Sequence, residues 1–220
     1  MFDISNILEA LSAERPVFHS EADFQHALAW KIHENSQEVD IRLEFKPPNL
    51  NKRVFLDVWA RDGKSQFAME LKYKTRRLPV RVNGEDFDLQ DQSAQDLGRY
   101  DFLKDVQRLE GIVLDREGLT GCAILLTNDS AYWSPPRHDR SVDASFRIHQ
   151  GRVVTGELCW GLRASKGTVL GREDPIIIRG NYRLGWRNYS QPSQVSYGKL
   201  RYLLIKVGEG PVRSLGLGVS

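Results

Sequence analysis

The stretch RVFLDVWARDGKSQFAMELKYKT, residues 53–75, decides the fold, because its alternation of apolar and polar residues predicts two strands joined by a tight turn. The alternation leaves one feature unexplained. Both apolar strands carry charges, namely Asp57 in the first arm and Glu70 and Lys72 in the second. A charge inside a strand is costly unless it is exposed, paired or bound to a metal ion. Which of these applies bears directly on function.

The register of the hairpin indicates where these charges point. A two-residue turn at residues 62–63 predicts that Asp57 pairs with Ala68. Glu70 is then the diagonal neighbour of Asp57 on the same face, at most about 7–8 Å away. Two carboxylates at that spacing can converge on one divalent ion. A one-residue bulge would move Asp57 to the opposite face, and an exposed face with a Glu70–Lys72 ion pair is the alternative.

The rest of the chain predicts helices and further strands around this hairpin. The segment 75–91 is polar and turn-rich, and no regular element is assigned to it. Residues 1–140 are expected to form an α/β core, and residues 141–220 a β-rich extension packed on the same sheet or layer. The predicted elements are a helix over 20–35, a strand over 38–46, the hairpin over 53–74, a helix over 93–114, and strands over 121–129, 152–160, 174–186 and 199–207.

Polar residues lie at the head of the apolar stripe of each long helix. Glu21 lies on the same side of the first helix as Phe24 and Leu28, and Gln95 and Arg99 extend the stripe of the second helix. We therefore expect all three polar side chains to face the sheet. A carboxylate favoured by the helix dipole would also explain Glu21, and an ordinary structural ion pair would also explain Arg99.

Basic residues lie at the end of the hairpin and just after it. Lys74, Arg76 and Arg77 form an edge that suits a phosphate backbone, although a solvated charged surface gives the same pattern. In the second helix, the spacing of Asp105 and Arg108 predicts a simple ion pair on the helix surface.

Composition sets outer limits on function. The chain has 220 residues and a formal net charge of +2, so nucleic-acid binding would need a local basic patch. Cys122 and Cys159 fit neither a zinc pattern nor a secreted disulfide framework. No apolar run approaches the roughly 18 residues that span a bilayer, and the N-terminus lacks the pattern of a signal peptide. We expect a cytoplasmic protein.

The charged residues of the hairpin resemble the PD-(D/E)xK nuclease superfamily, whose fold is that of restriction endonucleases. Asp57 matches the first acidic residue of the motif, and Glu70-Leu71-Lys72 matches its (D/E)xK element, 13 residues further on. Glu21 matches the additional acidic residue that many members carry on the preceding helix. The resemblance covers about residues 18–129 and includes the order helix, strand, hairpin, helix, strand.

The resemblance implies a restriction-endonuclease-like mixed sheet flanked by helices, with the β-rich C-terminal part added. It implies Mg²⁺, or Mn²⁺ in its place, held by Asp57, Glu70, the Leu71 carbonyl and Glu21. Lys72 would lie beside the attacking water.

The implied activity is hydrolysis of nucleic acid, with DNA favoured over RNA, and a homodimer is favoured. The alternatives are a catalytically silent nuclease-like domain that binds nucleic acid or a protein, and a structural module whose hairpin charges face water. The residues expected to contact nucleic acid are Lys74, Arg76, Arg77, Gln95 and Arg99.

Overall fold

The structure is a computed structural model that describes residues 3–48, 54–114, 116–136 and 140–208. The helices are α1 (Ile4–Glu14), α2 (Glu21–Asn35), α3 (Gln95–Val113), the 3-10 helix η1 (Ala144–Phe146) and α4 (Lys166–Val169). The strands are β1 (Asp40–Phe45), β2 (Leu56–Asp62), β3 (Ser65–Lys74), β4 (Leu78–Val82), β5 (Glu85–Leu89), β6 (Leu119–Thr127), β7 (Val153–Leu158), β8 (Ile176–Arg183), β9 (Trp186–Ser190) and β10 (Leu200–Val207).

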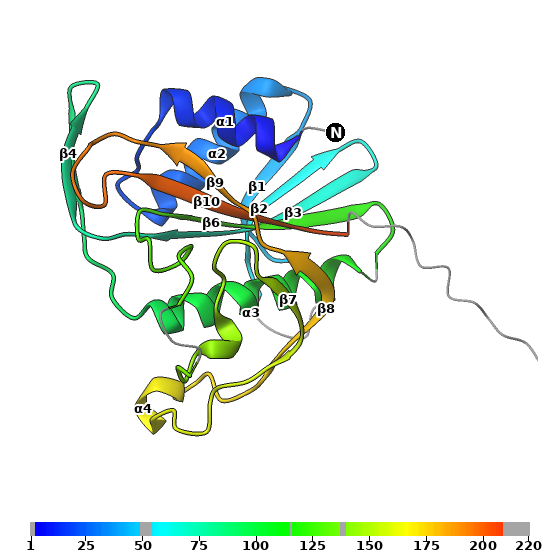
Figure 1. The fold of residues 1–220 in the computed structure, drawn as a ribbon. Helices are drawn as coiled ribbons and strands as arrows, with labels where there is room; N and C mark the ends of the chain where they lie inside the picture. Colours follow the sequence, from blue (N-terminus) through cyan, green and yellow to red (C-terminus); the bar gives the residue numbers. More distant parts are fainter. Residues whose placement is uncertain (1–2, 49–53, 115, 137–139, 209–220) are drawn as a thin grey trace, which may run out of the picture.

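A six-stranded mixed sheet forms the centre of the molecule, in the order β1-β2-β3-β6-β10-β9. β3 and β6 are parallel, and the other neighbouring strands are antiparallel. Helices α1 and α2 cover one face, and α3 covers the other (Figure 1). The predicted α/β class is confirmed. The sheet combines strands from residues 1–140 with β9 and β10 from residues 141–220, and the β7–β8 hairpin packs on α3.

Two elements differ from the sequence prediction. The helix α1 was not predicted, although Asp3 caps it by accepting the N–H of Ser5. The hairpin that β4 and β5 form within residues 75–91 was not predicted either. Its turn is Asn83-Gly84, and both residues have positive φ angles, 51° and 87°, as a type I′ turn requires.

The main hairpin exists as predicted, but its turn lies one residue later. Asp62 pairs with Ser65, so Gly63 and Lys64 form the turn, and Trp59 rather than Asp57 lies opposite Ala68. The pairing partners have therefore shifted by two residues along β3. A shift of two preserves the face of every side chain, so Asp57 keeps its predicted side of the sheet. The first predicted hairpin residue, Arg53, lies outside the described residues.

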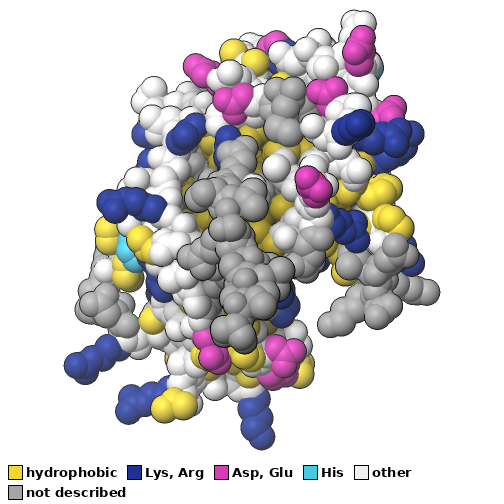
Figure 2. Space-filling view, turned by 90° about the vertical axis from the view of Figure 1, so that its right-hand side faces the viewer, with side chains coloured by type: hydrophobic (Ala, Val, Ile, Leu, Met, Phe, Trp, Pro, Cys, Tyr) yellow, Lys and Arg dark blue, Asp and Glu magenta, His cyan; other side chains and the backbone are white. Residues whose placement is uncertain are grey.

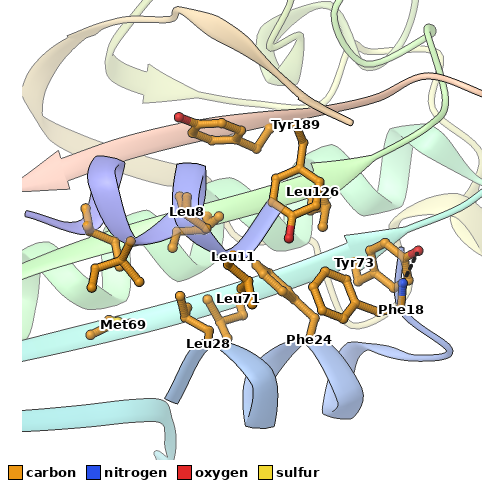
Figure 3. Close-up of a cluster of buried hydrophobic side chains, with 14 of the residues drawn as sticks. Leu8, Leu11, Phe18, Phe24, Leu28, Met69, Leu71, Tyr73, Leu126 and Tyr189 are labelled. Atoms are coloured by element: carbon orange, nitrogen blue, oxygen red, sulfur yellow. Dashed lines mark hydrogen bonds between the residues drawn. The ribbon is translucent and has the colours of Figure 1, made fainter. Parts of the chain in front are cut away.

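The hydrophobic core has two parts, one on each face of the sheet. Leu71 and Tyr73 of β3 belong to the part under α1 and α2, where the backbone N–H of Phe18 donates to the Tyr73 hydroxyl (Figure 3). Ala68 belongs to the part under α3. Side chains alternate along a strand, so the α3 side also receives the charged residues of β3.

The first predicted helix is confirmed as α2. Ser20 caps it, because its hydroxyl accepts the N–H of Asp23. Within the described ranges, no helix is long and apolar enough to cross a membrane.

Candidate active site

The candidate site lies on the α3 side of β2 and β3. Asp57 Oδ2 accepts the backbone N–H of Leu71 at 2.6 Å. The backbone carbonyl of Asp57 accepts from Gln25 Nε2 of α2, also at 2.6 Å. Glu70 is only 2% exposed, so it does not face water, which removes the reading of this face as a solvated surface. Hydrogen bonds from β3 and from α2 therefore hold Asp57 in place near the buried carboxylate of Glu70.

Glu21 joins the start of α2 to the end of β3. Its Oε2 accepts the backbone N–H of Tyr73 at 2.8 Å, and its Oε1 lies 3.7 Å from Lys72 Nζ. The first turn of a helix favours a carboxylate through the helix dipole, and here that carboxylate also binds the strand. These contacts place the Glu21 carboxylate beside the end of β3, on the side of α2 that faces the sheet.

Lys72 lies among the acidic groups of the site. Its Nζ is 3.1 Å from Asp105 Oδ2 and donates to the Leu71 carbonyl, also at 3.1 Å. Burial acts to lower the pKa of Lys72, but the charges of Asp105, Glu21 and Asp57 outweigh burial and raise it. Lys72 is therefore a fixed positive charge at neutral pH.

Asp105 and Arg108 of α3 complete the site. From the sequence, neither of them was assigned a function. Arg108 Nε donates to Glu70 Oε1, and Nη2 lies near Glu70 Oε2, both at 2.8 Å. Arg108 Nη2 also donates to Asp105 Oδ1 at 2.5 Å. The predicted Asp105–Arg108 pair exists, but Asp105 is 6% exposed and the pair faces the strand charges. The sequence does indicate that Asp105 faces inward, because it lies on the apolar stripe of the helix between Phe102 and Leu109.

The charge balance of the six side chains is uneven. The carboxylates are Glu21, Asp57, Glu70 and Asp105, and the cations are Lys72 and Arg108. With all six ionised, the formal charge is −2 in a largely buried site. One divalent cation would neutralise it.

The pKa values of Asp57 and Glu70 are raised. Burial raises the pKa of Asp57 to about 6, although the hydrogen bond from Leu71 and the charge of Lys72 act to lower it. Burial and the charge of Asp105 raise the pKa of Glu70, against the opposing effect of Arg108. Ionised carboxylates at these positions are unfavourable, so an additional cation would stabilise them.

The donors present are suitable for Mg²⁺, which prefers oxygen ligands and usually takes one or two carboxylates with water. Asp57, Glu70 and the Leu71 carbonyl are all oxygen donors. In the part of the chain that the structure describes, no group of three or more His, Cys, Asp or Glu side chains is arranged to hold a metal ion. The fit therefore rests on two carboxylates and a carbonyl, and Glu21 is engaged with Tyr73 and Lys72.

The residues expected to contact nucleic acid are distributed differently. Arg99 is 4% exposed and forms a buried pair with Asp143, so it does not reach the surface. Arg99 thus fits the alternative stated for it, an ordinary structural ion pair. Gln95 donates to Asp129 at 2.8 Å.

The basic edge is only partly available at the surface. Arg76 pairs with Asp91 at 2.8 Å and lies over the Tyr197 ring, Lys74 is half-buried, and Arg77 is exposed. Figure 2 shows the opposite side of the molecule from β4, and on that side basic side chains are interspersed with acidic ones.

Comparisons with known proteins give no relative from which function could be transferred: no family model, curated protein or solved structure matches the chain.

Proposed function

We propose that this protein is a divalent-metal-dependent nuclease of the PD-(D/E)xK type with a restriction-endonuclease-like core. The observation that carries the proposal is the convergence of Glu21, Asp57, Glu70 and Lys72 on one largely buried site, whose carboxylates would give it a formal charge of −2 if all were ionised. The observed order α2, β1, β2–β3, α3, β6 also agrees with the order of elements in the resemblance, with the β4–β5 hairpin inserted before α3.

Each residue has a chemical role that its contacts support. Asp57, Glu70 and the Leu71 carbonyl would hold Mg²⁺ or Mn²⁺, with Glu21 close by. Such an ion polarises a phosphate and lowers the pKa of bound water. Lys72 is held between Asp105 and Glu21 and would stabilise negative charge that develops on the phosphate.

The substrate in this proposal is a nucleic acid, with DNA favoured over RNA. The half-buried Lys74 ends β3 and the exposed Arg77 follows shortly after it, so both lie beyond Lys72 and would contact phosphates next to the cleaved bond. A homodimer stays a prediction, which light scattering would test.

One observation favours the silent nuclease-like domain as a second candidate. Arg108 forms an ion pair with Glu70, so a positive charge from the protein itself already balances one carboxylate that a metal ion would otherwise balance. A silent domain would bind nucleic acid or a protein without divalent ions. Its weakness is that it gives no reason for Lys72, Asp57 and Glu21 to occur together at the same site.

Cleavage assays separate the two candidates. Single- and double-stranded DNA and RNA are incubated with the protein and Mg²⁺, Mn²⁺ or EDTA. The nuclease proposal predicts metal-dependent cleavage that falls about a hundredfold or more in Lys72→Met. Lys166→Met, at an exposed position on α4, is the matched control and should retain activity. Nucleic-acid binding without cleavage under every metal condition would support the silent domain.

A further inference from the structure

Arg108 occupies the position beside Glu70 that a metal ligated by this carboxylate would need. Its guanidinium contacts both oxygens of Glu70 at 2.8 Å. Glu70 is 2% exposed, so its carboxylate has almost no solvent-facing side left for a second cation. Two cations on one enclosed carboxylate would also repel each other strongly.

We propose that Arg108 is an internal counter-ion that must leave Glu70 before a divalent ion can bind there, so that guanidinium and metal exclude each other. This inference rests on the proposed metal site and adds a built-in inhibitory contact to it. The apoprotein would then be held in a metal-free form by its own side chain, and metal affinity would include the cost of displacing Arg108.

The surroundings of Arg108 provide a place for the displaced guanidinium. Asp105, one helical turn earlier on α3, already accepts from Nη2 at 2.5 Å. The Arg108 side chain is 32% exposed, in contrast to Glu70. The guanidinium can therefore release Glu70 while Nη2 keeps its bond to Asp105, which is itself only 6% exposed, and it avoids the penalty of an unpaired buried charge.

Metal titration of Arg108→Gln tests the proposal. Mg²⁺ and Mn²⁺ binding is measured by calorimetry, and the metal-induced rise in Tm is measured alongside, for the wild type and the variant. We expect about tenfold tighter binding, or more, in Arg108→Gln, as for two ligands that compete through one site. The matched control is Arg172→Gln, because Arg172 pairs with Asp101 of the same helix and is 30% exposed. Its metal affinity should equal that of the wild type.

The possible results separate this inference from the proposed function. Equal or weaker metal binding in Arg108→Gln than in the wild type would overturn the inference and leave the metal site standing. Absence of binding by both proteins, with DNA also present, would overturn the metal site and the inference with it.

If Arg108→Gln fails to fold, a measurement on the wild type still tests the proposal. The Arg108 Nε–H resonance, assigned through its loss in Arg108→Lys, reports the contact with Glu70 directly. We expect this resonance to shift and its solvent exchange to accelerate as Mg²⁺ is added. An unchanged resonance at saturating metal would show that the pair persists, which contradicts the proposal.

Discussion

Asp57 Oδ2 accepts the backbone N–H of Leu71 across the β2–β3 pair, with 2.6 Å between the two atoms. The bond places a carboxylate of one strand against the (D/E)xK element of the next. It also fixes the Asp57 side chain on the α3 side of the sheet, where Glu70 is buried. The arrangement holds two acidic groups near each other although burial makes their ionisation unfavourable.

Replacement of Asp57 by Asn should stabilise the metal-free protein and abolish metal binding. Asn retains an oxygen that can accept from Leu71 and removes a charge that burial disfavours. We expect the free energy of unfolding at pH 7.5 to rise by about 1–2 kcal/mol, allowing for partial solvation of the group. Urea denaturation in EDTA measures this change.

A second Asp-to-Asn change provides the control for that experiment. Asp86 in β5 pairs with Arg81, and its side chain is 75% exposed. Asp86→Asn should alter the free energy of unfolding by no more than about 0.5 kcal/mol. Destabilisation by Asp57→Asn, or equal effects of the two variants, would contradict a strained carboxylate at position 57.

The raised pKa of Asp57 predicts a specific pH dependence. Between about pH 4 and pH 6 the folded chain holds a proton on Asp57 that the unfolded chain has released. The free energy of unfolding of the metal-free protein should therefore fall as pH rises through this window. The contribution of Asp57 is the difference between wild type and Asp57→Asn, measured by urea denaturation at each pH.

Metal affinity should follow the opposite course. A divalent ion competes with the proton on Asp57, so binding measured by calorimetry should strengthen as pH rises from 5 to 7. An affinity that is constant over this range would show that Asp57 is not a ligand.

Lys72→Met should destabilise the metal-free protein, and added metal should restore part of the loss. The change removes the cation beside Asp105 and Glu21, so we expect a loss of about 3 kcal/mol in the free energy of unfolding. Added Mg²⁺ should raise the Tm of the variant more than that of the wild type, because the metal replaces the missing positive charge. Unchanged stability in calorimetric melts would mean that Lys72 is not needed to balance the acidic groups.

Glu110→Gln should weaken the fold without affecting the site. Glu110 is 1% exposed and accepts from the backbone N–H groups of Arg179 and Gly180 and from the Tyr182 hydroxyl. Gln offers one acceptor oxygen in place of two, so we expect a loss of about 1–3 kcal/mol. Hydrogen exchange should accelerate at the amides of residues 179 and 180, with metal affinity unchanged. Altered metal binding would show that the β7–β8 hairpin is coupled to the site.

Local sequence pattern predicted the elements that position the site, because these depend on neighbouring residues. The Ser20 cap and the period-2 alternation of β2 and β3 are signals of this kind. The face of Asp57 was predicted even though the turn was misplaced, since the resulting register shift was two residues. The Asn83-Gly84 turn carried an equally local signal for the β4–β5 hairpin, so that omission was avoidable.

The remaining features depend on contacts between distant parts of the chain. Arg108 contacts Glu70 across 38 residues, and Arg99 contacts Asp143 across 44. The spacing of Asp105 and Arg108 fits a surface helix pair just as well as a buried one. Only the crossing of α3 over β3 decides between the two, and that crossing is a property of the folded chain.

Calorimetric titration with Mg²⁺ and Mn²⁺ measures directly whether Asp57 and Glu70 bind a divalent ion. The wild type is compared with the double variant Asp57→Asn, Glu70→Gln, in the absence and presence of DNA. We expect binding of defined stoichiometry by the wild type and none by the double variant. Equal binding by both proteins, or no binding by the wild type even with DNA present, would contradict a divalent-metal site at these carboxylates.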